Sequence, residues 1–227
     1  MPNHIRFAIG LAAGLGTFVI ASALMESDAP ATALPEYWPA PAFELLDQEG
    51  DSLRRSDLLG SVWVASFIFT SCADVCPGIS ARMARLGEEL REERVLGAGV
   101  RLVSFTVDPE RDSPDVLREY AQGFGGLEPA EWAFVTGTRP DSVRAMIQTG
   151  FHLTAMKPGM ESDDGGRAES GSDSGHDAHA AEASYQVMHS PRVLLVDRYG
   201  SVRGIYDATD SESMNAILGD ALALLND

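Results

Sequence analysis

Residues 62–77, VWVASFIFTSCADVCP, carry the pattern that best predicts the fold of this chain. The first half, residues 62–69, is a nearly continuous apolar run with aromatic and β-branched side chains, which is typical of a strand buried on both faces. Pro77 suits the first position of a helix, and apolar residues then recur at helical spacing. Those residues are Ile79, Met83, Leu86 and Leu90. The sequence therefore predicts a central strand, a loop with two cysteines, and a helix from about residue 77 to 94.

The sequence on either side adds further strand and helix patterns. The predicted elements are a hairpin at 43–46 and 52–54, a strand at 100–108, a helix at 113–124, a strand at 132–136, a helix near 140–149, a hairpin at 192–197 and 202–206, and a closing helix along 214–225. The order βαβαβα followed by ββα predicts an α/β fold of thioredoxin type. We expect a three-layer sandwich with a central mixed sheet.

Composition and charge narrow the classes of function. The chain has 227 residues, of which 44% are hydrophobic and 22% charged, so it should fold into one packed domain. It carries 34 acidic and 17 basic residues, and its formal charge of −17 repels nucleic acid. We therefore expect no nucleic-acid partner.

The N-terminal residues 1–25 are predicted to be a signal-anchor or transmembrane segment. Residues 7–25 contain no charge, follow His4 and Arg6, and would span about 28 Å as a helix. The triplet at 21–23, Ala-Ser-Ala, leaves open cleavage as a signal peptide. In either case the rest of the chain should face the periplasm or another extracytoplasmic side.

Two further segments depart from the regular pattern. Residues 26–41 are rich in proline and are predicted to be an extended tether before a domain at 42–227. Within that domain, residues 157–184 are rich in Gly, Ser and Asp and have few large apolar side chains. This stretch is predicted to be a flexible acidic insertion.

The candidate chemistry lies at the two cysteines, Cys72 and Cys76, where a buried strand ends and a helix begins. Unpaired N–H groups at a helix start favour a thiolate, so we expect a lowered pKa for Cys76. The spacing also allows a disulfide, which makes the two residues a possible redox pair. A purely structural disulfide is the alternative, but closing so short a loop would stabilise the fold little.

Two sulfur ligands with an imidazole would suit copper, above all monovalent copper in a three-coordinate site. The best candidate for the imidazole is His189, which comes just before the strand predicted at 192–197. The alternative is that His189 is only a surface histidine. The remaining candidates are weaker: His152 is read as packing or surface, His176 and His179 as transient metal binders at most, and Met156 and Met160 as minor copper-handling residues.

Four blocks of sequence together resemble a known family. They are TSCADVCP at 70–77, similar to a T-x-C-P-D-x-C-P pattern, SFTVDPERDSP at 104–114, HSPRVLLVD at 189–197, and the N-terminal segment. The chain resembles the Sco/SenC family of copper-binding, thioredoxin-like assembly proteins of cytochrome oxidase. Ala73 replaces the usual proline of the first block, and Met188 stands where an aspartate commonly precedes the histidine. The second change puts the affinity of a copper site in doubt more than its identity.

The resemblance implies that Cys72, Cys76 and His189 bind copper. It also implies two partners, which are a copper donor protein and the copper A centre of cytochrome c oxidase subunit II. The chain would then be a copper chaperone. A thiol–disulfide oxidoreductase that acts on exported or oxidase cysteines is the alternative, whereas no resolving-cysteine pattern supports a peroxidase. Asp108, Pro109 and Arg111 are expected to form a turn held by an ion pair.

Overall fold

The computed structural model describes residues 34–126, 128–153 and 191–227. The segment predicted to be an anchor, the acidic insertion at 157–184, and His189 lie outside these residues. Within the described ranges, no helix combines the length and the hydropathy that crossing a bilayer requires.

The predicted order of strands and helices is confirmed. The elements are β1 (Glu44–Leu46), β2 (Ser52–Arg54), a 3₁₀ turn η1 (Arg55–Leu58), β3 (Val62–Ile68), α2 (Val75–Glu92), β4 (Val100–Thr106), α3 (Pro114–Gln122), β5 (Trp132–Val135), α4 (Pro140–Ala145), a π-helical turn η2 (Met146–Gly150), β6 (Arg192–Val196), β7 (Val202–Asp207) and α5 (Ser211–Asn226). Helix α2 begins two residues earlier than expected, so Pro77 is its third residue. Proline is tolerated there because the first N–H groups of a helix have no partner within the helix.

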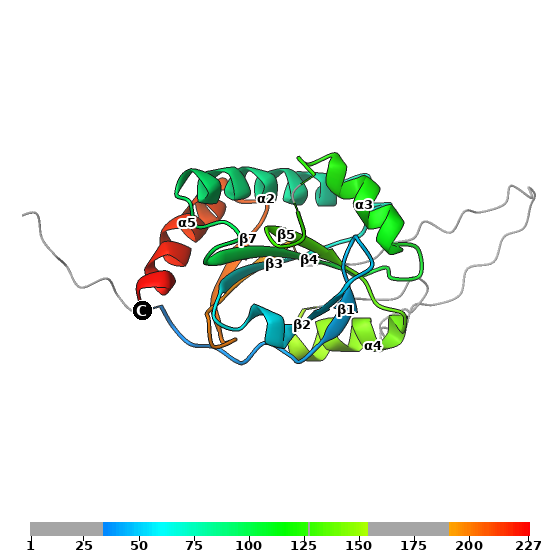
Figure 1. Cartoon of the computed structure of the whole chain (residues 1–227), viewed down its shortest axis with the longest axis horizontal. Helices are drawn as coiled ribbons and strands as arrows, with labels where there is room; N and C mark the ends of the chain where they lie inside the picture. Colours follow the sequence, from blue (N-terminus) through cyan, green and yellow to red (C-terminus); the bar gives the residue numbers. More distant parts are fainter. Residues whose placement is uncertain (1–33, 127, 154–190) are drawn as a thin grey trace, which may run out of the picture. The chain divides into compact units, whose positions relative to one another are not determined.

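The central sheet is mixed, as predicted. Its five strands lie in the order β5-β4-β3-β6-β7, with β3, β4 and β5 parallel and with β6 antiparallel to both β3 and β7. Figure 1 shows α2, α3 and α5 on one face of this sheet, and α4 with the β1–β2 hairpin on the other. The three-layer α/β sandwich is therefore confirmed. The loops after β3, β4 and β5 leave the sheet at one shared edge, because the three strands are parallel.

The segment expected to be a tether makes regular contacts at its end. Tyr37 N–H donates to the Val202 carbonyl at 2.9 Å, and Val202 N–H donates to the Trp38 carbonyl at 2.8 Å. Ala40 N–H also donates to the Gly200 carbonyl at 2.8 Å. Residues 37–40 thus pair with the chain around β7. The periodicity of this short, proline-rich stretch does not indicate such pairing, since the partner residues lie at least 160 positions away.

The face of the sheet that meets α4 is filled by an aromatic cluster, which we define as Phe43, Trp63, Phe67, Phe105 and Phe151. Phe105 is central: its ring centroid lies 5.2 Å from that of Phe43, 5.5 Å from that of Phe67 and 5.1 Å from that of Phe151. Phe105 has no exposed surface. This cluster joins β3 and β4, whose ends carry the candidate site, to the segment after α4.

A substitution in β7 tests a second region of the core, where β7 packs against α5. A Cβ atom added at Gly204 would lie 2.4 Å from Tyr206 Oη and 2.5 Å from Cε2 of the same ring. That ring cannot move freely, since Tyr206 Oη donates to Asp220 Oδ2 of α5 at 2.6 Å. We therefore expect Gly204→Ala to lower the free energy of unfolding by about 1–3 kcal/mol, as overpacking does. Urea denaturation followed by circular dichroism measures this change.

Gly219 supplies the matched control. It lies in α5, and a Cβ atom added there meets nothing within 4 Å. Gly219→Ala should leave stability unchanged or raise it by about 0.5–1 kcal/mol, because alanine loses less backbone entropy in a helix than glycine. Equal stability losses in the two variants would contradict the packing described for β7.

Candidate functional site

The two cysteines lie where β3 ends and α2 begins. We call residues 69–76 the cysteine loop. Cys72 N–H donates to the Phe69 carbonyl at 3.2 Å, which turns the chain back directly after the strand. Because β3 and β4 are parallel, the cysteine loop lies beside the loop that follows Thr106. The site is therefore at the carboxyl edge of the sheet, where open α/β folds place their binding groups.

The structure brings the two sulfur-bearing residues together in the reduced state. Both cysteines are free thiols, and Cys76 N–H donates to Cys72 Sγ at 3.4 Å. Cys76 has no exposed surface, whereas Cys72 retains 8%. Of the two thiols, only that of Cys72 therefore keeps any surface that an incoming reactant can meet.

The expected lowering of the Cys76 pKa is wrong. Burial is the largest effect, and it raises the pKa of the Cys76 thiol well above its usual range. A hydrogen bond with the Phe69 backbone lowers this pKa by less, and Cys72 and Asp112 raise it slightly further. The N–H group at the helix start, which was expected to favour a Cys76 thiolate, instead points to Cys72 Sγ. In the absence of a cation, the buried thiol of Cys76 therefore stays protonated at neutral pH.

Helix α3 places the phenol of Tyr120 beside α2, the helix that contains Cys76. Tyr120 Oη lies 2.9 Å from Ser80 Oγ, and Ser80 is one turn beyond Cys76 in α2. Burial raises the pKa of Tyr120 to about 12, so its phenol is neutral at physiological pH. Its ring also packs against Phe124 and Phe134, with centroids 4.9 and 6.0 Å away. Tyr120 thus connects α3 to α2 close to the site.

The loop after β4 contains the predicted turn and one residue that sequence reasoning missed. Arg111 Nη1 lies 3.7 Å from Asp108 Oδ2, which confirms the expected ion pair. The missed residue is Asp112, whose buried carboxylate accepts hydrogen bonds from Thr70 in the cysteine loop and from Thr106 at the end of β4. Sequence reasoning missed Asp112 because it stands directly before Ser113, the N-cap of α3, and such a position suggests only a local role in the turn. The signal in the sequence was a threonine near the end of each of two neighbouring strands: Thr106 is the last residue of β4, and Thr70 lies two residues after β3.

The histidines fall into two groups. His152 is described: it is exposed and meets the Trp38 ring edge-on at a centroid distance of 4.8 Å, as expected of a packing or surface residue. His176, His179 and His189, like Met156, Met160 and Met188, lie outside the described residues. Within the part that the structure describes, no three His, Cys, Asp or Glu side chains are grouped as a metal site.

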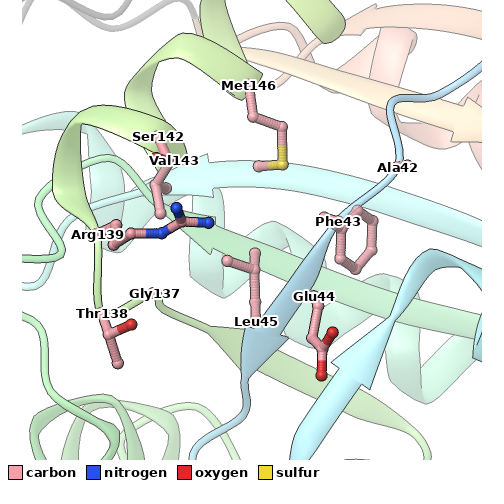
Figure 2. Close-up of a pocket in the computed structure, with 10 residues that line it drawn as sticks. All are labelled: Ala42, Phe43, Glu44, Leu45, Gly137, Thr138, Arg139, Ser142, Val143 and Met146. Carbon is pink, nitrogen blue, oxygen red and sulfur yellow. The ribbon is translucent and has the colours of Figure 1, made fainter.

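A pocket of about 360 Å³ lies between β1 and α4, away from the cysteines. Figure 2 shows its lining: Phe43, Glu44 and Leu45 come from the β1 segment, Arg139 from the loop after β5, and Met146 from the start of η2. Neither cysteine lines it. The pocket therefore does not contain the chemistry that the sequence predicts.

Comparison with known proteins gives a consistent match. The SCO1/SenC family matches residues 35–222 of the chain. A curated relative, the SCO1 protein homolog of Bacillus subtilis, is 29% identical over 178 residues, which are 78% of this chain and 78% of that protein.

Solved structures share the fold. A SCO1/SenC family lipoprotein from Bacillus anthracis has a TM-score of 0.66 and 29% identity, and the match covers 82% of this chain and 95% of that one. A second structure is that of BsSco, a member of the Sco family of cytochrome c oxidase assembly proteins in which a disulfide switch was identified. It has a TM-score of 0.64 and 25% identity, and the match covers 85% of this chain and 96% of that one. Arabidopsis thaliana ScoI with copper bound has a TM-score of 0.60 at 20% identity, with coverage of 82% and 98%, and it supports the fold alone. The thioredoxin-like fold is thereby confirmed.

Proposed function

Because this chain belongs to the SCO1/SenC family, we propose that it is a copper chaperone that loads the copper A centre of cytochrome c oxidase subunit II. Cys72, Cys76 and His189 are the proposed ligands, and a copper donor protein supplies the metal. Residues 1–25 are proposed to anchor the chain so that its domain faces the periplasm or another extracytoplasmic side.

The observation that carries this proposal is the pair of buried thiols in one loop, with Cys76 N–H directed at Cys72 Sγ. Thiolate and imidazole ligands suit copper, and monovalent copper accepts three of them. The sulfurs meet the requirement for soft donors. The imidazole of His189 would complete the set from outside the described residues, in which no third donor is grouped with the cysteines.

The unequal burial of the cysteines suggests an order of transfer. A thiolate of the target would replace the partly accessible Cys72 first, and the fully buried Cys76 would release copper last. The neutral Tyr120 beside α2 adds no charge to the site. Copper could thus pass between proteins by stepwise exchange of sulfur ligands without being released to water.

A second function is favoured by the same two thiols. The pair could act as a thiol–disulfide oxidoreductase, with Cys72 attacking a client disulfide and Cys76 resolving the mixed disulfide. The client then leaves with two thiols, and the chain keeps a Cys72–Cys76 disulfide. A disulfide switch was identified in the similar protein BsSco, and this supports the alternative. The requirement for His189 separates the two functions, since copper binding needs it and dithiol exchange does not.

Replacement of His189 tests the proposal directly. We expect the reduced full chain to bind one Cu⁺. We expect His189→Ala to weaken this binding by at least about 100-fold, because losing a residue that only contacts a metal ligand already lowers metal affinity by about 10- to 100-fold. Competition with a chromogenic Cu⁺ chelator measures the affinity. His152→Ala is the control, because His152 is an exposed imidazole packed on Trp38.

The rate of disulfide exchange with glutathione should be nearly the same in both histidine variants. If His189→Ala retained the native copper affinity and lost disulfide exchange instead, the chaperone function would be ruled out in favour of another role for this histidine.

A further inference from the structure

One buried carboxylate connects the cysteine loop to the neighbouring strand. Asp112 Oδ1 accepts from Thr70 Oγ1 at 2.5 Å, and Oδ2 accepts from Thr70 N–H at 3.1 Å and from Thr106 Oγ1 at 2.5 Å. Thr70 is two residues before Cys72, and Thr106 is the last residue of β4. Asp112 and Thr106 have no exposed surface. We refer to Asp112, Thr70 and Thr106 as the carboxylate clamp.

Among the described residues, the carboxylate of the clamp is held by hydrogen bonds and not by an ion pair. Among the described residues, no Lys or Arg pairs with Asp112, and the adjacent Arg111 lies 3.7 Å from Asp108 instead. The hydrogen bonds of the Asp112 side chain come from two residues, Thr70 and Thr106. Burying a carboxylate costs free energy unless its oxygens accept hydrogen bonds, so the groups that donate these bonds, on Thr70 and Thr106, are restrained.

The carboxylate is itself held rigidly. Asp112 N–H donates to the Asp108 carbonyl at 3.0 Å, and Asp108 N–H donates to Thr106 Oγ1 at 3.0 Å. Ser113 then caps α3 through a bond from Val116 N–H at 3.4 Å. Asp112 is thus fixed by β4 on one side and by α3 on the other. Through Thr70, it transmits this fixed position to the cysteine loop.

We propose that Asp112 is a positioning residue for the two cysteines. It acts by holding Thr70 against the end of β4, so that Cys72 stays beside the start of α2. This inference rests on the proposed function only in assuming that Cys72 and Cys76 are the reactive residues. It assigns the SFTVDPERDSP block a task, which is to supply the carboxylate that orders the TSCADVC block.

The consequence can be measured without copper. Reaction of the dithiol with oxidised glutathione forms the Cys72–Cys76 S–S bond, breaks the glutathione S–S bond and gives two reduced glutathione molecules, which take up the two thiol protons. The equilibrium constant of this reaction is the effective concentration of the two thiols. Effective concentration depends strongly on how well two groups are held in position.

The test uses Asp112→Asn and Thr70→Val in the copper-free full chain. Each variant keeps the shape of the native side chain and removes part of the clamp. We expect the glutathione equilibrium constant to fall by about tenfold in both, because orientation contributes large factors to effective concentration. Thr70→Ser, which keeps the hydroxyl group, should stay within about twofold of the native value, since it can still bond the carboxylate.

Asp197→Asn is the matched control. Asp197 is also a buried carboxylate, and it accepts the N–H groups of Tyr199 and Ser201 at 2.9 Å each and pairs with Arg203 at 3.0 Å. It follows Val196, which pairs with Trp63 near the opposite end of β3. This variant should lower the Tm as Asp112→Asn does and leave the glutathione equilibrium constant unchanged.

Two results would overturn the inference. One is an unchanged constant in Thr70→Val, which also decides the matter if Asp112→Asn does not fold. The other is an equal change in Asp197→Asn, which would trace the effect to general stability. Because the assay contains no copper, a chain that binds no copper but responds as expected would refute the chaperone proposal and leave the positioning role supported.

Discussion

Replacing Cys76 with serine should nearly abolish copper binding. The variant loses one of two soft sulfur donors, and a hydroxyl is a poor ligand for monovalent copper. We expect affinity for Cu⁺ to fall by more than about 1000-fold, which exceeds the 10- to 100-fold cost of losing an outer contact. Competition with a Cu⁺ chelator on the reduced full chain measures the loss.

The buried position of Cys76 requires a second variant and a control. Cys76 has no exposed surface, so the new hydroxyl of Cys76→Ser could destabilise the fold by itself. Cys76→Ala removes the sulfur without adding a buried polar group, and it should lose copper equally. Ser80→Ala, one turn later in α2, breaks a contact with Tyr120 but no metal contact, and it should bind as the native chain does. Native affinity in both Cys76 variants would exclude this cysteine as a ligand.

Truncating Phe105 should cause the largest loss of stability. Phe105 is fully buried at the centre of the aromatic cluster, and its ring contacts those of Phe43, Phe67 and Phe151. Phe105→Ala removes these contacts and leaves a cavity, which typically costs about 3–5 kcal/mol. A typical domain has only about 5–15 kcal/mol of stability, so much of the margin would disappear. Urea denaturation monitored by tryptophan fluorescence measures the change.

Leu59→Ala is the control for this prediction. Leu59 is apolar but 48% exposed, and its truncation should change stability by no more than about 0.5 kcal/mol. Similar losses in the two variants would mean that the aromatic cluster does not dominate the packing between the sheet and α4. A smaller loss in Phe105→Ala than in Leu59→Ala would contradict the described core outright.

The strands, the helices and their order could be predicted from local patterns. The apolar run at 62–69 and the spacing of Ile79 and Met83 report burial on one or both faces of a single element, which needs no distant partner. The closeness of Cys72 and Cys76 also follows from their spacing along the chain. The limits of α2 were less accurate, because proline is compatible with several positions in the first turn.

The position of His189 relative to the two sulfurs remains a prediction, since local patterns cannot establish a contact over more than one hundred residues. The carboxylate clamp shows the same limit within the described residues. Asp112 and Thr70 are 42 residues apart, and only the parallel pairing of β3 with β4 brings them together.

The sequence by itself determined the class of fold, the order of its elements and the pair of thiols at a strand-to-helix junction, because each depends on residues that are neighbours along the chain. Only the tertiary structure decided the state of those thiols. Full burial of Cys76 raises its pKa, although the start of a helix alone would lower it. Desolvation depends on every element packed around a group, and it therefore cannot be read from the residues on either side.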